Sequence, residues 1–116
     1  MQQSKLKAVE RELIALEVSQ RSDCEYCTTA HSKLMRLHRV EETEIAAAVA
    51  GQPMSNPRHA LVQYAAQLLY DKQGSLSEGG LADAELIEVI AIIGWYVLST
   101  FVNNLAHTEV DAIWTD

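Results

Sequence analysis

Residues 12–31 read ELIALEVSQRSDCEYCTTAH and contain two helical segments joined by a short polar link. Before the link, apolar residues recur every three or four positions, which predicts an amphipathic helix over about residues 4–20. The stripe consists of Leu6, Val9, Leu13, Leu16 and Gln20. After the link, Ser22 and Glu25 form a capping box that predicts the start of a second helix, over about residues 23–37. Because the link is short, we expect the two helices to form an antiparallel hairpin.

The rest of the chain predicts three more helices, over about residues 41–50, 57–72 and 84–105. Gly51 suits the left-handed backbone conformation that ends a helix, and Asn56 followed by Pro57 suits a helix start. Asp83 is expected to cap the last helix, after a mobile glycine-rich loop over residues 74–80. The sequence therefore predicts an all-α fold of about five helices.

The composition is that of one small folded domain, spanning residues 1–116. Hydrophobic residues make up 48% and charged residues 22%, and the net charge of −7 falls entirely on residues 59–116. No basic stripe is left to neutralise phosphates, so the charge pattern excludes a nucleic-acid binder. The first dozen residues lack the apolar segment of a secretory signal, so a reducing cytoplasm is the expected location.

The last predicted helix contains LIEVIAIIGWYVLSTFV, residues 86–102, which is apolar nearly all the way round. Glu88 and Asn103 leave the uncharged run shorter than the roughly 20 residues that a bilayer requires. We therefore expect a buried C-terminal helix, packed on several sides, rather than a membrane span. A chain of 116 residues can cover little of such a helix, so part of it is expected to pack against other subunits of an oligomer.

Candidate chemistry lies in CEYCTTAH, residues 24–31. Cys24, Cys27 and His31 share one face of the second helix, because their spacing is three and four residues. The positive N-terminal end of a helix favours thiolates, and His31 is close enough to Cys27 to exchange a proton with it. Cys27 is thus the candidate nucleophile, and Cys24, nearer the helix end and solvent, the thiol that resolves or initiates disulfide exchange.

A third group is needed to orient the imidazole. If the hairpin turns near Ser22, Glu12 lies about as far before the turn as His31 lies after it, so the two should meet. Glu17 is a rival, because it lies at the level of Cys27, and the spacing does not separate the two. The same Cys, His and carboxylate groups could hold zinc, but structural zinc sites join two separated ligand pairs and no second pair is present. We therefore favour redox chemistry, with no metal and no bound cofactor.

The run from Glu12 to His31 resembles the core motif of the alkylhydroperoxidase AhpD-like proteins, within the carboxymuconolactone decarboxylase-like superfamily. The family pattern is a Glu, eleven residues, CxxC, three residues and a His, and Glu12, Cys24, Cys27 and His31 fit it without a gap. The chain departs from the better-studied peroxidases at Tyr26, where they carry a histidine. It also lacks a short helix around residues 74–83.

This resemblance implies an all-helical, trimeric or hexameric protein that reduces hydroperoxides. It implies that Cys27 attacks the peroxide, that Cys24 resolves it as a disulfide, and that His31 and Glu12 relay protons, which favours Glu12 over Glu17. A dithiol or dihydrolipoyl-type protein is the implied reductant. The alternatives are a non-peroxidatic disulfide reductase, a redox-sensing or zinc-binding module, and a decarboxylase-like lyase on the same scaffold.

Overall fold

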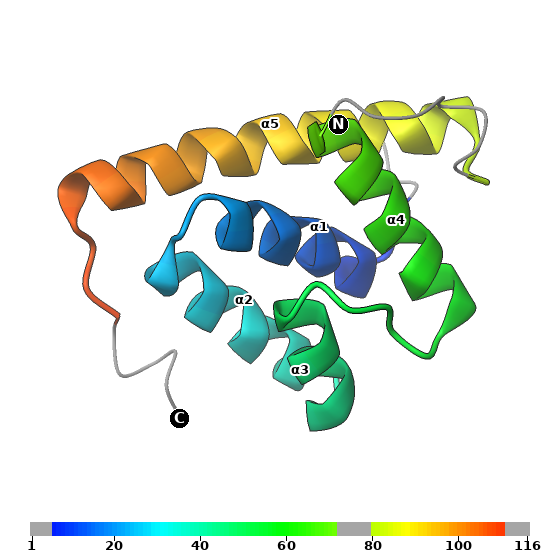
Figure 1. The fold of residues 1–116 in the computed structure, drawn as a ribbon, viewed down its shortest axis with the longest axis horizontal. Coiled ribbons are helices and arrows are strands. Elements are labelled where there is room, and N and C mark those ends of the chain that lie inside the picture. The colour runs from blue at the N-terminus through cyan, green and yellow to red at the C-terminus, as the bar shows by residue number, and fades with distance from the viewer. Residues whose placement is uncertain (1–5, 72–79, 111–116) are drawn as a thin grey trace.

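The computed structural model describes residues 6–71 and 80–110, and within these ranges it contains five α-helices and no strand (Figure 1). The helices are α1 (Ala8–Arg21), α2 (Glu25–Leu37), α3 (Glu42–Val49), α4 (Pro57–Asp71) and α5 (Asp83–Ala106). The predicted all-α fold of about five helices is confirmed. The predicted loop over residues 74–80 lies, apart from Gly80, outside the described residues.

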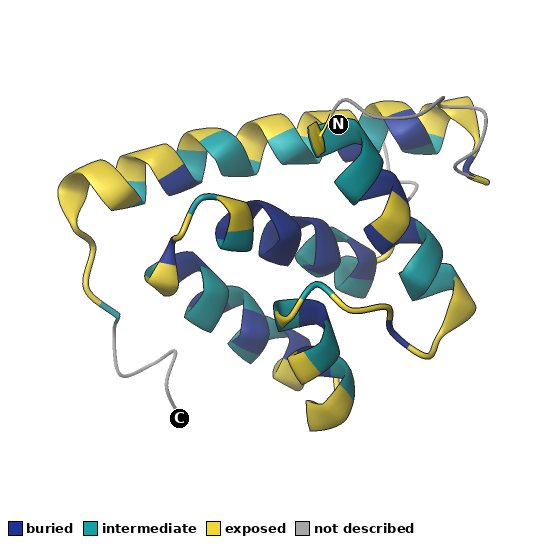
Figure 2. Ribbon diagram, in the orientation of Figure 1, coloured by how far each residue is buried: buried dark blue, intermediate teal, exposed yellow. Residues whose placement is uncertain are grey.

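Helix α1 is the centre of the fold and separates two hydrophobic clusters (Figures 1 and 2). One cluster joins α1 to α4 and α5 and consists of Leu6, Ile14, Val62, Ala65, Ala66, Leu81, Leu86 and Val89. The other joins α1 to α2 and α3 and consists of Leu13, Leu16, Met35, Ile45, Ala48 and Met54. Every residue of α1 from Leu13 to Ser19 is buried, so this helix and not α5 is packed on several sides.

Helix α5 lies along the outside of the bundle and buries only one side (Figure 2). Its buried residues are Leu86, Val89 and Thr100, whereas Trp95 and Phe101 are about two-thirds exposed. The expected burial of this helix on several sides is therefore wrong for a single chain, because α1 and α4 cover one face only. Within the described residues α5 alone is long and apolar enough to span a membrane, a test that core helices of soluble proteins also pass.

The helix boundaries follow local hydrogen bonds, and several differ from the sequence prediction. Asn56 Oδ1 accepts the backbone N–H of Arg58 at 2.9 Å, so the predicted start of α4 at Pro57 is confirmed. Gly51 ends α3 with a φ of 72°, also as predicted. Helix α1 starts at Ala8 rather than near residue 4, because the Glu10 carboxylate accepts the Lys7 N–H at 2.8 Å.

Two predicted caps are wrong. Cys24, not Ser22, is the N-cap of α2. Asp23, between the two, takes a left-handed conformation with φ 54°, so the helix starts only after Cys24. Asp83 is the first residue of α5 rather than its cap, and the Ala82 N–H donates to Glu85 instead.

Candidate active site

The two cysteines form a disulfide at the start of α2. Their Cα atoms are 5.3 Å apart, as one helical turn requires. The Cys24 sulfur caps the helix by accepting the Cys27 backbone N–H at 3.2 Å. The first cysteine therefore lies against the positive end of α2, a position that favours a thiolate once the pair is reduced.

Both cysteines are buried, with 2% of Cys24 and 4% of Cys27 exposed. Cys24 was expected to lie nearer solvent than Cys27, but its exposed fraction is no larger, so that expectation is wrong. Cys24 nevertheless borders an open pocket of about 270 Å³ between the start of α2 and the end of α5, and Cys27 does not line it. The pocket is lined by Asp23, Cys24, Glu25, Tyr26, Asn103, Asn104, His107 and Thr108.

The expected contact between Glu12 and His31 is present. A Glu12 Oε2 atom of α1 lies 2.6 Å from Nδ1 of His31 on α2, and each side chain is 13% exposed. The antiparallel packing of α1 on α2 brings the two residues to one level. With Nδ1 bonded to the carboxylate, Nε2 is the ring nitrogen that can exchange a proton with a thiol or a substrate. The contact is observed, whereas the catalytic roles of these residues stay a prediction.

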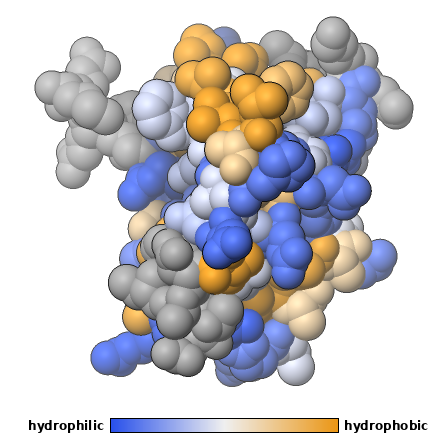
Figure 3. Space-filling model, turned by 90° about the vertical axis from the view of Figure 1, so that its left-hand side faces the viewer, coloured by the Kyte–Doolittle hydropathy of each residue, from blue (hydrophilic) through white to orange (hydrophobic). Residues whose placement is uncertain are grey.

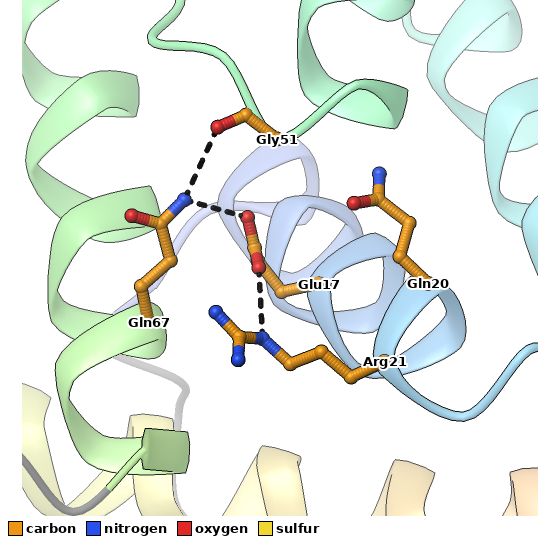
Figure 4. Close-up of a pocket in the computed structure, with 5 residues that line it drawn as sticks. All are labelled: Glu17, Gln20, Arg21, Gly51 and Gln67. Carbon is orange, nitrogen blue, oxygen red and sulfur yellow. Dashed lines mark hydrogen bonds and ion pairs between the residues drawn. The ribbon is translucent and has the colours of Figure 1, made fainter.

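The rival carboxylate, Glu17, is directed to a different part of the molecule (Figure 4). Its Oε1 accepts a hydrogen bond from Gln67 of α4 at 2.8 Å, and its Oε2 pairs with Arg21 at 3.3 Å. These groups, with Gln20 and Gly51, line a separate open pocket of about 480 Å³. Each carboxylate oxygen already has a partner, so this pocket offers no reactive group to the cysteines.

Two residues of α5 complete the surroundings of the motif, and sequence reasoning did not select either as a site residue. The ring of Tyr96 packs edge-on against His31, with centroids 4.8 Å apart. Burial, and then the charge of Glu12, raise the pKa of Tyr96, so its phenol stays neutral. Asn103 donates its amide N–H to the Cys27 sulfur at 3.7 Å.

A sequence pattern for this pair exists in hindsight. Tyr96 and Asn103 are seven residues apart, hence on one face of a helix, and both carry polar groups in a largely apolar segment. Nothing in the sequence, however, places that face against residues some seventy positions earlier. In the described part of the chain, no group of three or more His, Cys, Asp or Glu residues is arranged to hold a metal ion.

Comparison with known proteins finds one similar family and two solved structures of similar fold. Residues 1–54 match the model of the carboxymuconolactone decarboxylase family. No curated protein matches the chain. Among solved structures, an uncharacterized peroxidase-related protein from Silicibacter sp. TM1040 superposes with a TM-score of 0.78 at 20% identity, over 97% of this chain and 64% of its own.

A second solved structure gives the same result. An alkylhydroperoxidase AhpD core protein from Ralstonia eutropha JMP134, also described as an uncharacterized peroxidase-related protein, superposes with a TM-score of 0.79 at 19% identity. It is matched over 97% of this chain and 65% of its own. The first 54 residues are thus similar to the carboxymuconolactone decarboxylase family, and the whole chain has the fold of these two structures. It spans slightly less than two thirds of the length of these two structures.

The family match and the site overlap only in part. The matched residues cover α1 to α3, and with them Glu12, Cys24, Cys27 and His31. Tyr96 and Asn103 lie beyond the matched segment, on α5. The motif on α1 and α2 is thus completed by residues of a helix that the family model does not cover.

Proposed function

We propose that this protein is a thiol-dependent peroxidase that reduces alkyl hydroperoxides with the Cys24–Cys27 dithiol. The observation that carries the proposal is the Glu12–His31 pair, held at 2.6 Å on the face of α2 that carries the redox-active cysteines. A dithiol that forms a disulfide within one helical turn can accept and return two electrons without a large backbone movement. The AhpD-like family and the peroxidase-related names of the two solved structures agree with this chemistry.

In the proposed oxidative half-reaction, the Cys27 thiolate attacks the terminal oxygen of the hydroperoxide. The O–O bond breaks, the sulfur becomes a sulfenic acid, and the alkoxide leaves as an alcohol after it takes a proton from His31. Glu12 stabilises the imidazolium before the transfer and fixes the ring orientation. The Cys24 thiolate then attacks the Cys27 sulfur, forming the disulfide, and the hydroxide leaves as water with one further proton.

In the reductive half-reaction, an external dithiol restores both thiols and is itself oxidised to a disulfide. A dihydrolipoyl-type protein of a reducing compartment, such as the cytoplasm, is the proposed donor. The pocket beside Cys24 supports this step, because Cys24, unlike Cys27, is among the residues that line it.

The test is rapid mixing of pre-reduced protein with one equivalent of an organic hydroperoxide, followed by intact mass. Disulfide formation lowers the mass by about two units, and it should be much faster than the oxidation of free dithiothreitol. Cys24→Ser should stop at a sulfenic acid about 16 units heavier, and Cys27→Ser should not react. Undiminished turnover by Cys27→Ser would refute the assigned roles.

A second candidate function is disulfide reduction without a peroxide. The position of Cys24 favours it, because its sulfur caps a helix and the residue lines a pocket, which suits a thiol that attacks an external disulfide. Slow reaction with hydroperoxides and fast reduction of a disulfide substrate would support this candidate. Activity retained when both cysteines are replaced by serine would instead support a lyase on the same scaffold.

A further inference from the structure

The two sulfurs of the disulfide accept hydrogen bonds from different elements. Cys24 accepts a backbone N–H of its own helix, whereas Cys27 accepts the side-chain amide of Asn103 from α5. The Asn103 amide is oriented in advance, because the same nitrogen also donates to the Ser99 carbonyl at 3.0 Å. Its two N–H groups can therefore serve one carbonyl and one sulfur at once.

A donor at this position matters most when Cys27 is a thiolate. Burial disfavours a charged sulfur, and Cys27 is only 4% exposed. A hydrogen bond to an ionised acceptor is about twice as strong as one to a neutral acceptor. An amide that bonds weakly to the disulfide sulfur thus bonds more strongly to the thiolate that forms when the disulfide breaks.

We propose that Asn103 is a catalytic residue that stabilises the Cys27 thiolate as the leaving group when an external dithiol reduces the disulfide. The thiolate of that dithiol attacks the sulfur of Cys24, the cysteine that lines the pocket. A bond forms between the sulfur of the donor and the sulfur of Cys24. The Cys24–Cys27 bond breaks, and its electron pair goes to the Cys27 sulfur beside the Asn103 amide. The second thiol of the donor then displaces Cys24, which leaves as a thiolate, and the donor departs as a disulfide. This assignment rests on the proposed function.

The first experiment titrates each cysteine alone by thiolate absorbance. In a Cys24→Ser background, where Cys27 is the single thiol, Asn103→Leu should raise the titration midpoint by about one pH unit, as expected for loss of a hydrogen bond to a charged group. In a Cys27→Ser background, the same substitution should leave the midpoint of Cys24 unchanged. The neighbouring titratable residues are not substituted in any of these variants; they are Glu12, Asp23, Glu25, His31 and His107.

A charge control separates the hydrogen bond from general electrostatics. Asn103→Asp replaces the donor by an acceptor and should raise the Cys27 midpoint more than Asn103→Leu does. Asn104→Asp adds the same charge at the next residue, whose side chain donates to the Ser22 carbonyl rather than to a sulfur. It should therefore raise the Cys27 midpoint less. Equal shifts from the two aspartates would overturn the assignment, as would an unchanged midpoint in Asn103→Leu.

The second experiment measures the reduction step itself, starting from the isolated disulfide form. With dithiothreitol as the probe, Asn103→Leu should slow reduction and move the dithiol–disulfide equilibrium toward the disulfide, each by up to about tenfold. If the leucine variant does not fold, Asn103→Ala at this half-buried position repeats both measurements. Failure of the peroxidase proposal would appear as no disulfide formation in the parent protein with hydroperoxide. Failure of the Asn103 proposal would appear as unchanged titration and reduction in a protein that still reacts with hydroperoxide.

Discussion

His31 is held from two sides by groups of different character. The Glu12 carboxylate bonds its Nδ1, and the Tyr96 ring packs against the imidazole at 4.8 Å between centroids. The carboxylate sets which nitrogen carries the proton, and the aromatic ring restricts rotation of the imidazole. Because burial raises the pKa of Tyr96, its phenol does not compete as a charged base at neutral pH.

We predict that Tyr96 acts through its ring rather than its hydroxyl. Tyr96→Phe should keep the rate of hydroperoxide-driven disulfide formation within about twofold of the parent, whereas Tyr96→Ala should lower it by about tenfold, the value expected for losing an aromatic contact. Stopped-flow mixing with intact-mass detection measures both rates. A rate in Tyr96→Phe as low as in Tyr96→Ala would assign the role to the hydroxyl.

The Glu12–His31 pair gives a second prediction, with a matched control on the same helix. Glu12→Gln should lower the rate by about 10- to 100-fold, because the amide cannot stabilise an imidazolium. Glu17→Gln makes the same chemical change in the Gln67 pocket and should leave the rate within about twofold. If Glu12→Gln lowered the melting temperature strongly and left the rate unchanged, the pair would be structural.

The sequence could predict one half of this site. Glu12 and His31 meet across a short turn, so counting outward from that turn predicted their contact, although it did not exclude Glu17. Tyr96 and Asn103 come from a helix more than sixty residues later, and no local pattern specifies which side of α5 packs on α2. The cap at Cys24 was also missed, because cysteine is not a usual capping residue and Ser22 two positions earlier is.

At the scale of the helices, α1 is central because its polar residues have partners and its small residues allow close packing. Glu10 and Glu17 are both buried and both paired with arginine, so neither needs solvent. Ala15 and Ser19 are also fully covered, and Ser19 donates its hydroxyl to the Ala15 carbonyl. Hydrophobic periodicity predicted one apolar stripe on α1. It could not predict the two carboxylate–arginine pairs, because one arginine lies on α4 and the other on the next turn of α1.

Arg58 joins the starts of three helices. Its guanidinium bonds Glu10 of α1 at 2.7 Å and also pairs with Glu85 of α5. Burial alone would raise the pKa of Glu10, but the hydrogen bonds from Arg58 and the Lys7 N–H outweigh it and the pKa lies below its usual value. The Ala82 N–H and then Arg58 lower the pKa of Glu85. Because both carboxyls are more acidic in the folded state, their contribution to stability is present above about pH 4 and is lost as the pH falls further.

We therefore predict a pH-dependent cost for removing Arg58. Arg58→Met leaves the Glu10 carboxylate buried without its cation and should lower the free energy of unfolding by about 2 kcal/mol at pH 7. The loss should be smaller at pH 3, because the Glu10 carboxyl of the variant, without the cation that lowers its pKa, can take up a proton. Urea denaturation at the two pH values measures it. Arg36→Met, which removes an exposed pair with Glu42, is the control and should cost less than about 1 kcal/mol. An equal loss at both pH values would show that the pair contributes packing rather than charge.

At the scale of the whole molecule, α5 presents an uncovered apolar side to its surroundings. Figure 3 shows hydrophobic side chains gathered at the top of the molecule, where α5 lies. Its exposed large hydrophobic residues are Ile87, Ile90, Trp95, Leu98, Phe101, Val102 and Leu105. A continuous apolar side of this kind is rare on a soluble monomer and is typical of an interface. The sequence predicted the apolar character of α5. The described part of a single chain, however, does not bury this side of the helix.

The last prediction is that this side of α5 joins copies of the chain, as the resemblance of the Glu12–His31 motif to the AhpD-like proteins implies. Light scattering after size exclusion should give a trimer or hexamer of the 12.9 kDa chain. Leu98→Glu with Phe101→Glu places charges on the uncovered side and should give monomers, because burying two unpaired carboxylates is unfavourable. Leu37→Glu, at an equally exposed leucine on α2, is the matched control and should leave the oligomer intact. A monomeric parent protein that floats with lipid vesicles would show instead that a membrane covers α5, which is long and apolar enough for that alternative to be tested directly.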